Sequence, residues 1–134
     1  MTRLGLLLVL VTGPAVSLAG GAVDGLQTEY RAAGAGPFSA AAGAEAWQRQ
    51  VPADDGTAPR SCVTCHGDDP RAAGRHARTG KLIEPLAPAA NPARLSDPAT
   101  IEKWFRRNCE WTWGRTCTPQ EKGDFLTFLN SNRP

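Results

Sequence analysis

Apolar positions recur every three or four residues in three segments of this chain, which is the spacing of an amphipathic helix. The first segment runs from Ser39 to about Gln50, and the serine hydroxyl is suited to cap its first turn. The apolar face of this segment consists of Ala40, Gly43, Ala44 and Trp47. A glycine in mid-helix costs about 1 kcal/mol relative to alanine. We therefore expect another helix to cross closely at Gly43.

The other two helical segments lie near the C-terminus. The first begins with Asp97 as its cap and Pro98 in its first turn. Its expected buried stripe consists of Ile101, Trp104 and Phe105. The second opens with the capping box Thr118-Pro119-Gln120-Glu121, and its apolar face is Phe125, Phe128 and Leu129. Because no segment sustains a period of two, the predicted fold class is all-α.

Two stretches lack a clear period. Residues 67–95 are interrupted by Gly67, Gly74, Gly80, Pro70, Pro85, Pro88 and Pro92. A loop of this length in a small domain is usually functional or disordered. Its apolar residues favour a loop that wraps a cofactor; they are Leu82, Ile83, Leu86 and Leu95. Residues 20–37 are rich in Gly and Ala, and we expect a loose lead-in there, with room for a short helix around 26–33.

The N-terminus has the pattern of a signal peptide. Arg3 supplies a positive charge, residues 4–11 form a short apolar run, and Ser17-Leu18-Ala19 matches the small-x-small cleavage site. A membrane anchor is the alternative, but the run is shorter than the roughly 20 residues that span a bilayer, and Gly13-Pro14 interrupts it. We predict a signal peptide over residues 1–19, export to the periplasm and no membrane insertion of the mature chain.

Charge and length narrow the classes of function. Loss of residues 1–19 takes the formal charge from +2 to +1, and no concentrated basic stretch of the kind that binds nucleic acid is present. The length suits one small domain, which we place at residues 38–134. Such a domain buries a modest core, and a large apolar cofactor would supply much of it.

The most specific motif is Cys62-Val63-Thr64-Cys65-His66. Two thiols spaced in this way on one helical turn can form thioethers with the vinyl groups of a haem, and the adjacent imidazole then ligates the iron. A thioredoxin-like pair would need a βαβ context, a zinc site would need four ligands, and a plain disulfide leaves the histidine unexplained. We predict one covalent haem c attached through Cys62 and Cys65, with His66 as the proximal ligand.

The sixth iron ligand is not a methionine, because the only methionine is Met1 in the signal peptide. The His/Met pair of common electron carriers is therefore excluded. The iron is either five-coordinate or bound by His76, a lysine or an unusual ligand. His76 lies in a polar stretch that suits an exposed loop. Asn108 extends the stripe of its helix, so its amide either points inward towards the iron or caps the helix C-terminus, and the pattern leaves both open.

Cys109 and Cys117 are the remaining cysteines. Cysteines of an exported chain are expected to be paired or modified. A bridge between these two would close a loop of about nine residues and contribute about 2.5 kcal/mol on the chain-entropy estimate. It would also hold the backbone beside Asn108.

Several separate motifs, taken in order, resemble the sphaeroides haem protein (SHP) family. They are Cys65-His66-Gly67-Asp68-Asp69-Pro70, Thr79-Gly80-Lys81, Pro85-Leu86-Ala87-Pro88, Glu102-Lys103-Trp104, Arg107-Asn108-Cys109, Gly114-Arg115-Thr116-Cys117-Thr118 and Glu121-Lys122-Gly123-Asp124. The resemblance covers about residues 38 to 131. It implies a small class I cytochrome c fold, Asn108 as the sixth ligand and a Cys109–Cys117 disulfide. Residues 20–37 and the pair Trp111 and Trp113 lie outside the family pattern.

The resemblance also implies a function. Members bind oxygen, and the asparagine is expected to leave the iron on reduction and open a site for O₂, NO or cyanide. A plain electron-transfer cytochrome c, in which Asn108 stays bound, is the alternative. A reductase ranks last, because turnover usually needs a positioned acid or base and only His76 and Glu110 are at hand. We therefore predict no catalytic residue. The family implies a dihaem cytochrome c and a membrane cytochrome b as electron donors.

Overall fold

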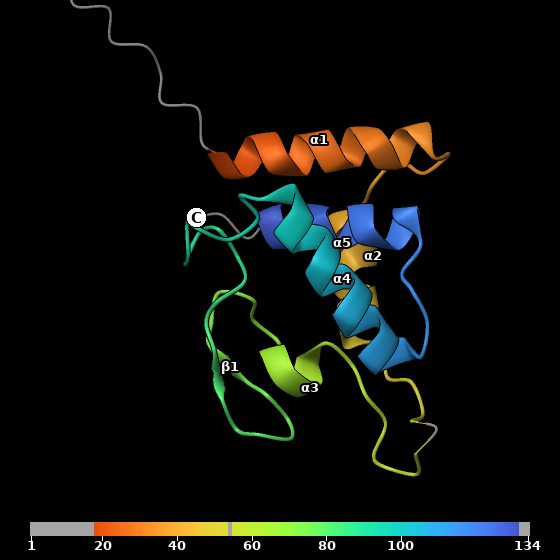
Figure 1. Cartoon of the computed structure of the whole chain (residues 1–134), viewed down its shortest axis with the longest axis vertical. Coiled ribbons are helices and arrows are strands. Elements are labelled where there is room, and N and C mark those ends of the chain that lie inside the picture. The colour runs from red at the N-terminus through yellow and green to blue at the C-terminus, as the bar shows by residue number, and fades with distance from the viewer. Residues whose placement is uncertain (1–17, 54, 132–134) are drawn as a thin grey trace, which may run out of the picture.

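The computed structural model describes residues 18–53 and 55–131, and the regular structure of this part is mostly helical (Figure 1). Its elements are α1 (Leu18–Ala32), α2 (Ala40–Gln48), α3 (Val63–His66), β1 (Gly74–Arg75), β2 (Leu82–Ile83), α4 (Pro98–Trp113) and α5 (Pro119–Ser131). The two strands pair antiparallel, with Gly74 opposite Ile83. Because each strand has only two residues, the all-α prediction is confirmed. None of the described helices is long and apolar enough to cross a bilayer.

The predicted helix caps are present. The hydroxyl of Ser39 accepts a hydrogen bond from a first-turn amide of α2 at 3.2 Å. The carboxylate of Asp97 accepts one from the amide of Thr100 at 2.7 Å. At the start of α5, the Thr118 amide donates to the Glu121 carboxylate at 2.9 Å, and the Glu121 amide donates back to the threonine hydroxyl at 3.2 Å. These bonds satisfy amides that have no partner inside their helices.

Helices α2 and α5 cross in direct contact. A Cβ atom added to Gly43 would lie 2.3 Å from the carbonyl oxygen of Asp124 and 2.7 Å from Cβ of Phe128. Close by, the Trp47 ring lies 6.4 Å from the ring of Phe125 and 5.8 Å from that of Phe128, between centroids. The predicted crossing at Gly43 is confirmed, and only a residue without Cβ allows this approach.

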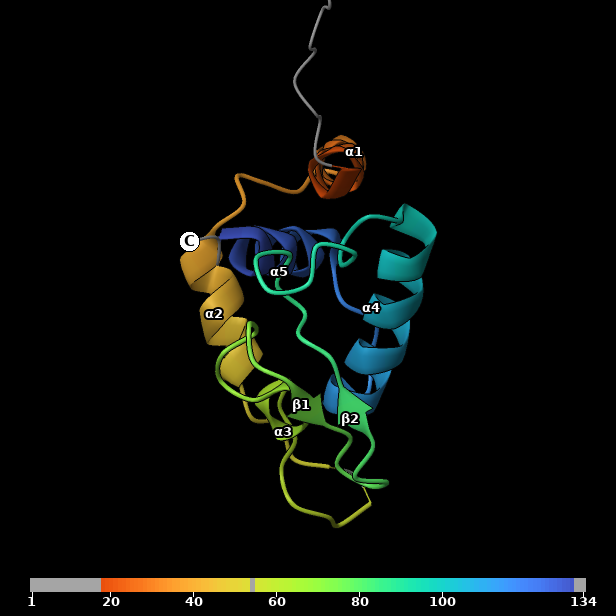
Figure 2. The ribbon, with the colours of Figure 1, turned by 90° about the vertical axis from the view of Figure 1, so that its left-hand side faces the viewer.

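The segment before α2 is not the loose lead-in expected from the sequence. Residues 18–32 form α1, which lies across α5 and the N-terminal end of α4 (Figure 2). Its buried residues pack with Ile101 and Leu126; they are Ala22, Val23, Leu26 and Tyr30. Gly20 and Gly21 before these positions and Gly25 between them dilute the apolar period in the sequence. The predicted signal peptide lies outside the described residues except for Leu18 and Ala19, which begin α1.

Helix α4 continues beyond Asn108, and its buried side differs from the stripe expected from the sequence. It ends at Trp113, where Gly114 takes a left-handed conformation with φ of 66°. Asn108 therefore lies inside the helix, and the alternative that it caps the C-terminus is wrong. Of the expected stripe only Ile101 is buried, whereas Trp104 is 44 % exposed. The face turned to the core consists of the buried residues Ile101, Cys109 and Thr112 and the half-buried Phe105. The adjacent side, here called the Asn108 face, consists of Trp104, Asn108 and Trp111.

The core consists of two apolar clusters joined by shared neighbours. The first lies beneath α1, and the second contains Ala46, Trp47, Cys109, Cys117, Phe125 and Leu129. Leu95 and Phe105 pack against both clusters. Cys62 and Val63 pack against the second cluster, which therefore connects the Cys62–His66 motif to α2, α4 and α5.

Candidate haem site

The attachment motif forms a single helical turn. Cys62 directly precedes α3, while Cys65 and His66 lie within it. The turn stops at Gly67, which has φ of 72° and whose amide donates to the Val63 carbonyl at 2.9 Å. Both cysteines are half-buried free thiols. Positions three apart on a helix lie on the same face, so the two thiols are presented to one side.

The surroundings of Cys62 argue against a thioredoxin-like redox pair. Burial raises the pKa of Cys62 to about 12, so this thiol stays protonated near neutral pH, unlike the reactive cysteine of a thioredoxin-like pair. In the described part of the chain, no three His, Cys, Asp or Glu side chains gather as metal ligands. Covalent attachment of a haem through two thioethers is the interpretation that accounts for both thiols and the adjacent histidine.

His66 is held by the proximal side of the core. Its ring lies 5.5 Å from the ring of Trp47, and the indole Nε1 of Trp47 donates to the carbonyl of Gly67 at 2.9 Å. Burial lowers the pKa of His66 to about 4, with a smaller contribution from the charge of Arg94. The imidazole is therefore neutral at physiological pH, which is the form that ligates iron.

The loop of residues 67–95 folds back on α3. A Cβ atom added to Gly74 would lie 2.2 Å from the carbonyl oxygen of Cys65 and 2.8 Å from Cα of His66. The amide of Ala77 donates to Sγ of Cys65 at 3.3 Å. The carbonyl of Pro70 accepts from two later amides of the same loop, at 2.9 and 3.0 Å. The loop is thus built against the motif, as a cofactor-wrapping loop requires.

Asn108 lies in the C-terminal half of α4. Figures 1 and 2 place α3 and the C-terminal half of α4 at the same end of the molecule. Asn108 is exposed and lies between Trp104 and Trp111, which are 44 % and 40 % exposed. Positions three and four apart are neighbours on a helix, so the amide is flanked by two indoles.

These residues fit a haem. Leu82, Trp104 and Trp111 are the large hydrophobic residues that are exposed in the described chain, and such exposed apolar side chains indicate a binding surface. The Nε1 atom of Trp113 is buried without a hydrogen-bond partner, which marks a donor that a polar group of a cofactor can satisfy. Half-buried thiols, a neutral imidazole and exposed apolar side chains are what a covalently bound porphyrin needs.

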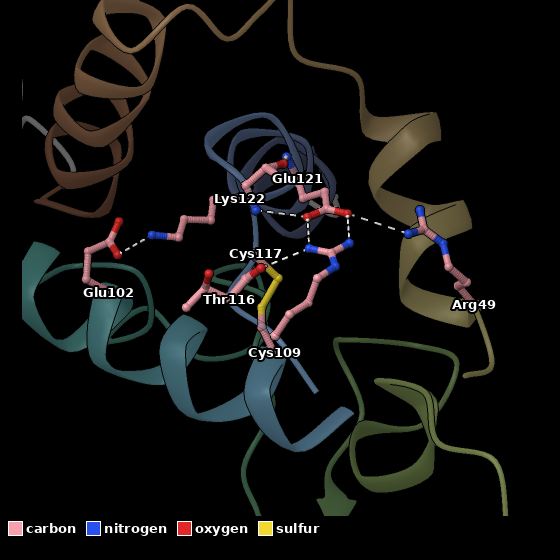
Figure 3. The surroundings of a disulfide bond; sticks show 9 residues. Arg49, Glu102, Cys109, Thr116, Cys117, Glu121 and Lys122 are labelled. Atoms are coloured by element: carbon pink, nitrogen blue, oxygen red, sulfur yellow. Dashed lines mark hydrogen bonds and ion pairs between the residues drawn. A yellow bond between two sulfur atoms is a disulfide. The ribbon is translucent and has the colours of Figure 1, made fainter. Parts of the chain in front are cut away.

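The disulfide between Cys109 and Cys117 is present, with a Cα–Cα distance of 5.6 Å (Figure 3). Beside it, Arg115 donates two hydrogen bonds to the carboxylate of Glu121, at 2.7 and 2.9 Å. These bonds hold the pKa of Glu121 at about 2. Arg49 approaches the same carboxylate at 3.6 Å. The bridge and the ion pairs tie the end of α4 to α2 and α5.

His76 lies in the turn between β1 and β2. Its Nδ1 atom accepts hydrogen bonds from the amides of Arg78 and Thr79, both at 3.3 Å. The ring is half-buried rather than exposed as expected. Because Nδ1 is used by its own turn, the ring is tied to that turn.

Some residues of this region were not singled out from the sequence. Arg94, which depresses the pKa of His66, donates to the carbonyls of Pro85 and Glu84 at 3.0 and 3.3 Å. Nothing in the local pattern indicates that contact. Gly74 could have been found, because an isolated glycine in a loop often marks a close backbone approach.

Relatives of the chain are found over most of its length. Residues 33–129 match the model of a domain of unknown function, DUF1924. Cytochrome c-type protein SHP of Cereibacter sphaeroides is 44% identical over 130 residues, which cover 96% of this chain and 98% of that protein. Cytochrome c'' of Methylophilus methylotrophus is 38% identical over 69 residues, covering 52% of this chain and 48% of that one.

Solved structures of the same relatives resemble the fold of this chain. The structure of oxidised SHP, an oxygen-binding cytochrome c, has a TM-score of 0.74 at 42% identity and covers 82% of this chain and 96% of that one. The crystal structure of oxidised cytochrome c'' from Methylophilus methylotrophus has a TM-score of 0.71 at 29% identity, covering 84% and 92%. The prediction of a small cytochrome c fold is confirmed. The resemblance of the sequence motifs is confirmed as well, and the chain belongs to the SHP family of c-type cytochromes.

Proposed function

We propose that this protein is a periplasmic monohaem c-type cytochrome that accepts an electron and binds small diatomic ligands, such as O₂ and NO, when Asn108 leaves the iron. The observation that carries the proposal is the position of Asn108. It lies mid-helix on an exposed face between two indoles, beside a disulfide, in a chain whose only methionine is Met1.

The residues have distinct parts in this function. Cys62 and Cys65 attach the haem, and His66 is the proximal ligand. Haem iron supplies reversible electron uptake and, in the ferrous state, affinity for diatomic ligands. The amide oxygen of Asn108 is a hard, weak ligand that suits Fe(III) better than Fe(II). Once free, the amide can donate a hydrogen bond to a bound diatomic ligand, which is one way in which distal pockets favour particular ligands.

The relatives support this assignment. The solved SHP is an oxygen-binding cytochrome c, and a solution structure of cytochrome c'' bears on haem-ligand detachment. The latter shares a TM-score of 0.69 at 29% identity with this chain. Export through a signal peptide over residues 1–19 places the protein in the periplasm. A dihaem cytochrome c supplied by a membrane cytochrome b is the proposed electron donor.

Absorption spectra of the oxidised, reduced and reduced-plus-carbon-monoxide protein test the proposal. We expect a six-coordinate ferric form and a ferrous form whose spectrum changes on addition of carbon monoxide. A reduced spectrum that carbon monoxide leaves unchanged would contradict ligand binding and leave a simple electron-transfer cytochrome.

Three variants assign the sixth ligand. Asn108→Ala should leave the ferric iron high-spin and speed cyanide binding. Asn108→Met should give a low-spin ferrous form that resists carbon monoxide, because a thioether suits Fe(II). His76→Ala is the control and should leave both spectra nearly unchanged. If His76→Ala opens the site and Asn108→Ala does nothing, the ligand is His76 and the protein is a bis-histidine electron carrier.

A further inference from the structure

Arg60 makes an unusual set of contacts for a loop residue. Its guanidinium lies over the ring of Trp111, 4.7 Å from the centroid, and its Nη1 donates to the Trp111 carbonyl at 3.2 Å. Nη2 pairs with the carboxylate of Asp55 and also donates to the hydroxyl of Thr57 at 3.1 Å. The side chain is only 20 % exposed. Because the carboxylate holds the cation over the indole ring, this is a specific cation–π contact.

The backbone of Arg60 is coupled to the attachment motif. Its amide and carbonyl both bond to Val51, at 2.9 Å each, so the loop between them is closed at its base. The next residue, Ser61, is buried, and its amide donates to the hydroxyl of Thr64 at 3.0 Å. Arg60 therefore lies in a hydrogen-bonded segment directly before Cys62 and α3.

The partner of Arg60, Trp111, belongs to the Asn108 face of α4. Trp111 lies three positions beyond Asn108 on α4, so the two side chains are neighbours on the helix surface. The ring of Trp113 is contacted by two cations, the guanidinium groups of Arg49 and Arg115, which lie 4.9 and 5.2 Å from its centroid. Helix geometry places Trp113 on a different side of α4 from Asn108, because the five positions that separate the two residues leave them about 140° apart around the helix.

We propose that Arg60 and Trp111 form a clamp between the haem attachment segment and α4, and that this clamp sets how readily Asn108 leaves the iron. This inference rests on the proposed function. The disulfide holds Cys109 on the buried face, and the clamp holds the exposed face of the same turn. With the clamp intact, the turn that carries Asn108 has little freedom to withdraw. Arg60 and Trp111 are positioning residues that act through Asn108.

Cyanide binding to the ferric holoprotein tests the clamp, because Asn108 must leave before cyanide can enter. Arg60→Gln and Trp111→Leu should each bind cyanide about fivefold faster than the wild type, the factor that loss of one cation–π contact corresponds to. Arg60→Lys should restore a rate between those of Arg60→Gln and the wild type. Arg115→Gln removes one of the two guanidinium contacts of Trp113 together with the ion pair to Glu121, and so loosens the same end of α4 without touching the Asn108 face. This variant should change the rate by less than about twofold.

The same rates separate failure of the clamp from failure of the function. Unchanged cyanide rates in Trp111→Leu and Arg60→Gln, with a faster rate in Asn108→Ala, would overturn the clamp and leave Asn108 as the ligand. Equal acceleration by Arg115→Gln would also overturn it, because general loosening of α4 would then suffice. If Asn108→Ala itself has no effect, the proposed function fails first. Should Arg60→Gln lose its haem during expression, Trp111→Leu alone decides.

Discussion

The crossing of α2 and α5 at Gly43 gives a prediction whose sign can be worked out from the structure. Replacement of Gly43 by alanine adds one methyl group to a helix interior, a change that by itself favours helix formation by about 1 kcal/mol. At this site the new Cβ would lie 2.3 Å from the carbonyl oxygen of Asp124 and 2.7 Å from Cβ of Phe128. Neither obstructing atom can rotate away, so the helices must move apart.

The steric cost should exceed the gain in helix propensity. To restore ordinary contact of about 3.5 Å, the helices must separate by about 1 Å, which loosens the packing of Trp47 on α5. Overpacking of a core usually costs about 1–3 kcal/mol. We therefore expect Gly43→Ala to lower the melting temperature of the holoprotein by about 4–8 °C for each kcal/mol lost. Gly43→Leu should be worse.

Gly25 provides the matched control. It also lies inside a helix, α1, but a Cβ atom added there would have no heavy atom within 4 Å. Gly25→Ala should therefore stabilise the protein, by up to about 1 kcal/mol. Thermal unfolding followed by circular dichroism measures both variants. A Gly43→Ala protein as stable as Gly25→Ala would refute the close crossing.

Further predictions concern the haem, the cysteines and the pH. One haem per chain should survive acid-acetone extraction, and extractable haem would contradict covalent attachment. Alkylation of the native protein should label no cysteine, since Cys109 and Cys117 are bridged and the other two are thioethers. Gly74→Ala should lower the yield of haem-loaded protein, because the added Cβ meets the carbonyl of Cys65 at 2.2 Å. The depressed pKa of Glu121 means that its stabilising effect is complete above pH 4.5 and is lost as the pH falls to about 2. Glu121→Gln should remove the part of the acid-induced loss of stability that comes from this carboxylate. A profile of stability against pH that Glu121→Gln leaves unchanged would argue against a stabilising role of Glu121.

The elements that the sequence predicted best are those defined by local signals. Ser39, Asp97 and the Thr118–Glu121 box begin helices because each bonds an amide within its own first turn. The crossing at Gly43 was predictable because a glycine in an otherwise favourable helix needs an explanation outside that helix. The covalent motif is equally local, since its five residues occupy one turn.

Features that depend on distant partners were missed or misplaced. Helix α1 is stabilised by burial against Ile101 and Leu126, and its own glycine-rich sequence only weakly indicates a helix. Trp104 was expected in the core because its spacing fits, but the buried side of α4 is set by Cys109, which the disulfide fixes on the side of α2 and α5. The contact of Arg60 with Trp111 joins segments whose proximity no local pattern encodes.

A ligand that leaves and returns needs a core that stays in place while the ligand moves. Cys109 is locked by the disulfide into the cluster that contains Trp47, and Trp47 in turn touches the ring of His66. Successive helical residues differ by about 100°, so fixing Cys109 inward directs Asn108 to the margin of the exposed face. The same core thus positions both proposed iron ligands, His66 and Asn108. Release of a weak amide ligand then requires movement of the turn held by Arg60 and Trp111, and no repacking of that core.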